Sequence, residues 1–239
     1  MRRTRVLLFR SVFLLIIICL SLFYFLQSSF WSIQTIIVEG NHFLGETEVL
    51  ELASMPLGLN IFKADVNQGE KNIILHPLVK NTKITREFPR TIRITVQERV
   101  PLVLVPYQDG FWQVDENRVI LRYTSTITGI SLPLVTGIEL GEASPGEAIS
   151  SPELARVLEL ARELPLELEG SIGEINVLDS GMICLFTTQG IEVYLGDGER
   201  LEEKVQLLTQ VMAQENLELE RIKYIDLSFH GPAVIKYRD

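Results

Sequence analysis

The sequence has few cysteines, few histidines and little basic charge outside its first segment. Two of its 239 residues are cysteine and three are histidine, so the chain is not a small domain held together by several disulfides. After position 38 there are 18 basic and 31 acidic residues, a net charge of −13 at pH 7. Such an acidic body lacks the clustered lysine and arginine on which nonspecific nucleic-acid binding depends. Hydrophobic residues make up 46% of the chain, which excludes a disordered protein.

A recognisable active site is also lacking. His42, His76 and His230 are far apart in the sequence and share no metal-ligand spacing. Cys184 lies in an apolar stretch, where a thiol is unreactive. No phosphate-binding glycine loop or serine-hydrolase motif occurs. We therefore expect no enzyme activity, no metal and no cofactor, with a hydrolase that uses a carboxylate pair as the open alternative.

One long apolar run is present, at residues 6–26. As a helix it spans about 31 Å, which is the thickness of a bilayer core. Four arginines precede or enter the run, and no acidic residue occurs among the first 38, so the positive-inside rule places the N-terminus in the cytoplasm. We expect a cytoplasmic stub at residues 1–5, a single transmembrane helix at 6–26, and the rest of the chain outside the cell membrane.

A cleaved signal peptide is the alternative interpretation of the same run. The run is longer than the usual apolar region of a signal peptide, and residues 26–29 resemble a cleavage site only weakly. We favour the uncleaved anchor. A mature protein that starts near residue 30 would instead indicate an exported enzyme or binding module.

Residues 31–100 have the pattern of a small α+β unit. Strands are predicted at 31–38, 79–87 and 91–97, and the last alternates strictly between apolar and polar residues. Helices are predicted over Glu46–Ala53 and from Asp65 to Pro77. The second and third strands are separated by three residues and should form an antiparallel hairpin. The order predicts two helices on one face of a three-stranded sheet.

The remaining residues predict a larger unit of mostly antiparallel strands with two flanking helices. One helix should begin at Pro152, capped by Ser151, and end before Pro165. The other is predicted at residues 199–214, where apolar residues recur at helical spacing. The strands are predicted at residues 102–105, 111–114, 119–121, 172–178, 182–187, 191–195, 222–229 and 233–237.

Several short strings resemble those of a family of bacterial cell-division proteins. Residues 38–41, VEGN, resemble the first strand–helix junction of a POTRA domain. Residues 88–92 and 96–101, FPRTI and VQERVP, are similar to the passage from the POTRA domain to the β-domain in the FtsQ/DivIB family. Residues 132–137 and 224–228 resemble further strings of that family.

The sequence departs from the family pattern at one turn. The family usually has Asp-x-x-Gly where this chain continues from Asp115, and Asn117 stands at or near the glycine position. Asparagine tolerates the left-handed backbone that glycine would adopt there. We therefore expect Asn117 to take that conformation.

The resemblance implies a fold and a function. It implies a POTRA domain of order β-α-α-β-β at residues 32–100 and an FtsQ/DivIB-type β-domain at 101–239. The protein would be a non-enzymatic divisome scaffold at the septum that recruits FtsB- and FtsL-type partners, and so links to the septal peptidoglycan synthase. The alternative is a POTRA-containing envelope protein for polypeptide translocation or assembly, although such proteins normally carry several POTRA repeats or a long β-barrel.

The candidate partner-binding residues lie in the last strand and the last long helix. The strand at 233–237 has two interpretations from its residues alone: an edge that accepts a partner's strand, or a strand that completes the sheet with Lys236 as a protective charge. The resemblance favours the first, because in this family the C-terminal part of the β-domain binds the FtsB–FtsL pair. The expected contacts are Phe229, Val234, Ile235, Lys236 and Tyr237, with Arg200, Lys204 and Leu208 as secondary candidates.

Overall fold

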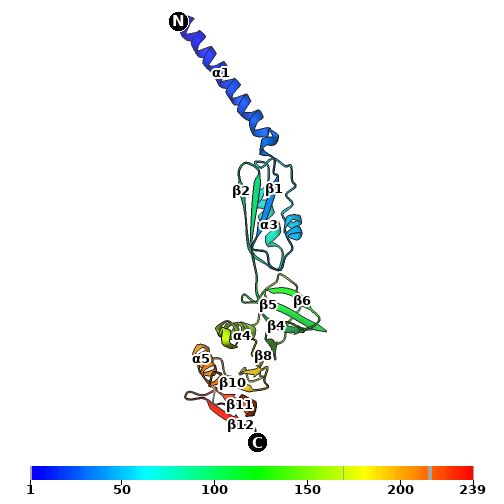
Figure 1. Ribbon diagram of the computed structural model, residues 1–239, viewed down its shortest axis with the longest axis vertical. Helices are drawn as coiled ribbons and strands as arrows, with labels where there is room; N and C mark the ends of the chain where they lie inside the picture. Colours follow the sequence, from blue (N-terminus) through cyan, green and yellow to red (C-terminus); the bar gives the residue numbers. More distant parts are fainter. Residues whose placement is uncertain (1, 169, 215–216, 239) are drawn as a thin grey trace. The chain divides into compact units, whose positions relative to one another are not determined.

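The chain consists of two compact units, which divide between Glu98 and Arg99. The computed structural model describes residues 2–168, 170–214 and 217–238, and Figure 1 shows their helices and strands. Met1 of the predicted stub and Asp239 of the predicted β-domain therefore lie outside the described residues. Each unit is described by itself.

The first unit begins with the long helix α1 (Arg2–Gln27), followed by a short 3₁₀ turn, η1 (Ser29–Trp31). Within the described residues, α1 contains one segment, Phe9–Gln27, that is long and apolar enough to cross a membrane, and none of this segment is buried inside the protein. The helix is longer than the predicted run at residues 6–26 because the arginine-bearing end continues it without a break.

A three-stranded sheet forms the centre of the first unit, in the order β1-β3-β2. Strand β1 (Thr35–Glu39) runs parallel to β3 (Thr91–Glu98), and β2 (Val79–Glu87) pairs antiparallel with β3. The predicted hairpin is therefore confirmed. The first strand starts four residues later than predicted, at Thr35, because residues 29–31 form the 3₁₀ turn.

Helices α2 (Glu46–Ala53) and α3 (Val66–Ile74) complete the first unit. Asp65 caps α3 as predicted, since its carboxylate accepts the backbone N–H of Gln68 at 3.1 Å. The apolar residues of the alternating strand β3, namely Ile92, Ile94 and Val96, are all buried. The alternation therefore identified the strand face that forms the core.

The second unit contains a nine-stranded sheet in the order β12-β11-β10-β9-β8-β7-β4-β5-β6. The short strand β7 (Leu134–Thr136) joins the two halves of the sheet, because it pairs in parallel with both β4 and β8. The other strands are β4 (Pro101–Tyr107), β5 (Gly110–Asp115), β6 (Ile120–Thr124), β8 (Ile172–Val177), β9 (Ile183–Thr187), β10 (Glu192–Gly196), β11 (Ile222–Asp226) and β12 (Val234–Tyr237).

Two helices, α4 (Pro152–Glu163) and α5 (Leu201–Met212), pack their apolar stripes into the core of this unit. Ser151 caps α4 by accepting the backbone N–H of Leu154 at 3.1 Å. Helix α5 is the crossover between β10 and β11, which are parallel. The expected α+β class, with two helices on a mostly antiparallel sheet, is confirmed.

Three local expectations need correction. The left-handed residue of the turn after Asp115 is Arg118, with φ 67°, and not Asn117; Arg118 is the fourth residue of the Asp-x-x-Gly pattern. Strand β11 ends at Asp226 because the Asp226 carboxylate accepts the backbone N–H of Ser228 at 2.8 Å and turns the chain. Helix α5 starts at Leu201, since Arg200 before it is also left-handed, with φ 52°.

Candidate functional site

Strand β12 lies at one end of the nine-stranded sheet, next to β11 near the C-terminus (Figure 1). It pairs antiparallel with β11, and in the part of the chain that the structure describes no strand pairs with its other side. The backbone N–H of Arg238 donates to the carbonyl of Arg221 at 2.7 Å. Because successive N–H groups of a strand point to opposite sides, those of Tyr237 and Ile235 point away from β11.

The side chains of this edge are largely apolar and largely exposed. Val234 is 56% exposed and Tyr237 is 43% exposed. Phe229, in the bend that precedes β12, is 76% exposed. Ile235 differs, because it packs against the core of the unit. Lys236 is the charged residue of the strand and is exposed.

An apolar hollow of about 450 Å³ lies beside this edge, over strands β10 and β11. Tyr194 and Tyr224 form its aromatic part, with ring centroids 5.7 Å apart. Asp226 lines the hollow and is the cross-strand partner of Val234, so Val234 is on the same face of the sheet. The lining residues are Leu178, Met182, Ile183, Tyr194, Gly196, Tyr224, Asp226, Ser228 and Phe229.

Three polar side chains of this hollow, Tyr194, Asp226 and Ser228, are hydrogen-bonded within the protein. The hydroxyl of Tyr194 donates to the Glu192 carboxylate at 2.5 Å, and this hydrogen bond, assisted by burial, raises the pKa of Tyr194 to about 12. The hydroxyl of Tyr194 is thus occupied, and the side chain offers its ring to a partner. The hollow is therefore suited to bind an apolar side chain of a partner.

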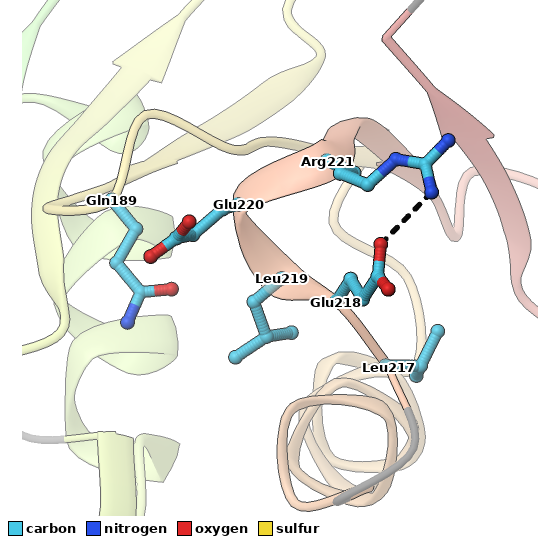
Figure 2. A pocket seen from close by; sticks show the side chains of 6 residues that line it. All are labelled: Gln189, Leu217, Glu218, Leu219, Glu220 and Arg221. Carbon is cyan, nitrogen blue, oxygen red and sulfur yellow. Dashed lines mark hydrogen bonds and ion pairs between the residues drawn. The ribbon is translucent and has the colours of Figure 1, made fainter.

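A second hollow, of about 710 Å³, is lined by Gln189 and by residues 217–221, which precede β11 in the sequence (Figure 2). Its two carboxylates point apart: Glu220 lies on the side of Gln189, whereas Glu218 pairs with Arg221 at 2.9 Å. Two carboxylates that work as acid and base must face a common substrate atom. This arrangement therefore does not support a carboxylate-pair hydrolase.

The secondary candidates at α5 differ in burial: one is exposed and two are buried. Arg200 is exposed and pairs with Glu203 at 3.1 Å. Lys204 is only 5% exposed, and its Nζ donates to the carbonyl of Leu195 on β10 at 2.6 Å. Leu208 is fully buried in the core. We therefore leave Lys204 and Leu208 out of the candidate surface and assign them to the attachment of α5 to the sheet.

The described residues hold no group of three histidine, cysteine or carboxylate side chains that could bind a metal ion. Cys184 is 2% exposed, and burial, with the neighbouring Glu192 charge, raises the pKa of its thiol to about 11. A thiol that stays protonated is a poor nucleophile. Cys184 is therefore not placed to act as a nucleophile.

Of the residues that line the apolar hollow, sequence reasoning named only Phe229 as a candidate contact. Tyr194 lies between the buried residues Val193 and Leu195, and this period of two is the signal that places it on the opposite face. Tyr224 carries no such signal, because the strand register shifts between the buried Ile222 and Tyr224. Leu178 and Met182, in the turn between β8 and β9, are exposed apolar residues and carry no comparable signal.

Comparison with known families agrees with this architecture. A family model described as "POTRA domain, FtsQ-type" matches residues 31–99. A second, described as "Cell division protein FtsQ/DivIB, C-terminal", matches residues 103–228, which is more than half of the chain. The chain belongs to the FtsQ/DivIB family of cell-division proteins. The resemblance stated from the sequence is thereby confirmed, and with it a role in the divisome.

Relatives of the FtsQ/DivIB family match over most of their length. The cell division protein DivIB of Clostridium acetobutylicum is 27% identical over 224 residues, covering 92% of this chain and 86% of the relative. The cell division protein FtsQ of Anaeromyxobacter sp. is 27% identical over 204 residues, covering 84% and 69%. A solved structure, the major extracytoplasmic domain of the trans isomer of DivIB from Geobacillus stearothermophilus, has 17% identity and a TM-score of 0.38, covering 51% of this chain and 99% of that domain.

The strings that resemble the FtsQ/DivIB family have structural roles in the first unit. Gly40 has φ +82°, and a Cβ there would lie 2.1 Å from the carbonyl oxygen of Val96, so only glycine fits. Glu98 accepts the backbone N–H groups of His42, Phe43 and Leu44 at 2.8–2.9 Å. Its carboxylate therefore holds the loop after β1 against the end of β3.

The next residue of the same string is tied into the second unit. Arg99 Nη1 donates to Asp115 Oδ2 at 2.8 Å, and Asp115 is 1% exposed. The other carboxylate oxygen of Asp115 accepts the backbone N–H groups of Asn117 and Val119. Asp115 thus organises the β5–β6 turn, which explains why a family pattern begins at this residue.

Proposed function

We propose that this FtsQ/DivIB-type chain is a non-enzymatic scaffold that holds FtsB- and FtsL-type partners by adding a partner strand to β12. The single observation that carries the proposal is the edge itself: β12 ends the sheet and is flanked by exposed apolar side chains. A natural edge is normally protected by charge, proline or a cover. Here Lys236 is the charged residue within the strand, while Val234, Tyr237 and Phe229 offer apolar contact.

The added strand would use two kinds of contact. The backbone groups of Ile235 and Tyr237 would pair with the partner's backbone and give affinity. Phe229, Val234 and the hollow over Tyr194 would receive apolar partner side chains and give specificity. Lys236 would contribute its charge, and Arg200 would contribute from the start of α5 if the partner extends that far. Through the FtsB–FtsL pair the chain would link to the septal peptidoglycan synthase.

The proposed topology has α1 crossing the cell membrane once. Residues 1–5 would be a cytoplasmic stub and 6–26 the transmembrane helix, with the POTRA domain at 32–100 and the β-domain at 101–239 outside. The four arginines at one end of the apolar helix support this orientation. A fluorescent fusion of the chain should collect at the division septum, whereas a uniform membrane signal would contradict the septal role.

The test of strand addition compares Tyr237→Pro with Tyr237→Ala. Both variants remove the exposed ring, but only proline also removes the outward N–H. With the full chain in nanodiscs and the purified FtsB–FtsL pair as ligand, Tyr237→Pro should bind about 5- to 150-fold weaker than Tyr237→Ala, since a hydrogen bond lost at a desolvated interface costs about 1–3 kcal/mol. Equal binding by the two variants would exclude strand addition at this position.

A further inference from the structure

Four aromatic side chains from three separate segments of the first unit form one contiguous patch. Phe30 and Trp31 come from η1, Phe62 from the stretch before α3, and Phe88 from the β2–β3 turn. The centroid of the Trp31 ring lies 5.0 Å from those of Phe30 and Phe62 and 6.1 Å from that of Phe88. Phe62 and Phe88 are stacked at 5.4 Å. We call this set the aromatic base.

The three phenylalanine rings of the aromatic base are exposed. Phe30, Phe62 and Phe88 are 42%, 44% and 57% exposed. Single exposed apolar side chains are normal on protein surfaces, but a contiguous apolar patch indicates an interaction surface. Their contacts with one another show that these rings are held as a set.

The covalent chain places the aromatic base close to the end of α1. Trp31 follows the last helical residue, Gln27, by four positions, so even a fully extended chain could separate them by no more than about 14 Å. The backbone is in fact tied down, since Asn60 Nδ2 donates to the carbonyl of Leu26 at 2.7 Å and Ile61 N–H donates to that of Trp31 at 2.8 Å. The segment that carries Phe62 is therefore fastened to the last turn of the apolar helix.

The upper limit of about 14 Å leaves the aromatic base within or next to the membrane–water interface. The polar layer on each side of the hydrocarbon core is about 5–8 Å thick, and aromatic rings favour it. Basic groups lie within the same set of residues. The guanidinium of Arg90 lies 5.1 Å from the centroid of the Phe30 ring, and Lys63, next to Phe62, is exposed. The nearby acidic residue Glu87 is paired with Arg93, whose Nε lies 2.5 Å from its carboxylate and whose guanidinium also pairs with Glu39.

We propose that the aromatic base inserts into the headgroup layer of the bilayer that α1 crosses, so that phospholipid is the partner of this face. Arg90 and Lys63 would then meet lipid phosphates while the rings bury apolar area. The inference rests on the proposed membrane anchorage. It adds that the first unit is held against the membrane by its own surface as well as by the chain.

The test uses tryptophan fluorescence of the full chain in nanodiscs made from phospholipids with brominated acyl chains, which quench nearby indoles. Trp112→Phe leaves Trp31 as the sole tryptophan, and the described residues contain no hydrogen-bond partner for the Trp112 indole that would be lost. In a Trp31→Phe, Trp112→Phe background, Phe62→Trp reports on the aromatic base. We expect brominated lipid to quench both single-tryptophan proteins.

The matched control is Phe43→Trp in the same double background. Phe43 is 49% exposed, similar to Phe62, but it lies beside Glu98 at the end of β3, whereas Phe88 precedes the start of that strand. The eight residues of β3 separate the two ends by about 25 Å. Quenching at position 62 should therefore be several-fold stronger than at position 43.

The outcomes separate this inference from the proposed anchorage. A chain that does not incorporate into the nanodiscs contradicts the anchor itself. A chain that incorporates, with quenching at position 62 no stronger than at position 43, keeps the anchor and overturns the lipid contact. Quenching of Trp31 without quenching at position 62 overturns it too, because only the connecting turn would then reach the interface.

Discussion

At the scale of single residues, the clearest local strain lies at Arg118. Its φ of 67° is left-handed, which costs a residue with a Cβ about 1–2 kcal/mol relative to glycine. Replacing Arg118 by glycine removes this cost, but part of the resulting gain in stability is lost because glycine has more conformational freedom in the unfolded chain. Arg118→Gly should therefore raise the free energy of unfolding by about 0.5–1 kcal/mol, measured by urea denaturation. Asn117→Gly is the control, because residue 117 has no positive φ; an equal gain there would contradict the explanation.

A second residue-scale prediction concerns acid stability. Burial alone would raise the pKa of Glu98, but the N–H groups of Leu44, Phe43 and His42 outweigh it and hold the pKa below its ordinary value. The stabilisation is therefore present above the ordinary pKa of a glutamate and is lost as the pH falls through the lowered one.

Glu98→Gln should test this directly. At pH 7 the substitution should lower the free energy of unfolding by about 1–3 kcal/mol, since hydrogen bonds to a charged acceptor are lost. The difference from the unmodified protein should shrink at acidic pH, as the pH falls through the lowered pKa of Glu98 and its carboxylate becomes protonated. Glu51→Gln, at an exposed glutamate of α2, should change little. A difference that is the same at both pH values would contradict the charge-based explanation.

At the scale of elements, α5 determines whether the edge of the sheet exists. Its Lys204 is buried and donates to the end of β10, so Lys204→Ala loses both this hydrogen bond and the packing of the lysine stem. We expect the free energy of unfolding to fall by about 1–3 kcal/mol, measured by urea denaturation. Arg200→Gly should change it by less than about 1 kcal/mol, because an exposed ion pair contributes little and glycine suits the left-handed backbone.

These two variants also separate structural from binding roles. If Arg200 contacts a partner, Arg200→Gly should weaken partner binding in a protein of nearly unchanged stability. Equal loss of stability from Lys204→Ala and Arg200→Gly would contradict the assignment of Lys204 as the residue that attaches α5.

Elements with strong local signals were predicted well. Helix α4 has a serine cap, a proline at its first position and a proline after its end, and its bounds agree with the prediction. Strand β3 alternates, and its buried face was identified. Strand β11 was predicted three residues too long, because the turn made by Asp226 and Ser228 involves hydrogen bonds that no periodicity reveals. Strand β7 was missed because its three residues are too few to show a period.

At the scale of the whole molecule, the order of elements was predictable but their neighbours in the sheet were not. The sequence shows that β12 follows β11, yet it does not show that β11 lies parallel to β10 with α5 as the crossover. That order of strands is what leaves β12 at the edge. The burial of Lys204 depends on the same crossover, which explains why sequence position alone suggested it as a surface contact.

The crossover has a consequence for how the edge forms and opens. Strand β11 can pair with β10 only after the chain from 197 to 221 has closed, and such non-local closure is entropically costly and slow. Strand β12 pairs with β11 alone in the described residues, so we expect its amide protons to exchange faster than those of the central strand β9. A partner that binds only the closed edge would slow this exchange in proportion to its own concentration, because its binding free energy adds to the local stability of β12.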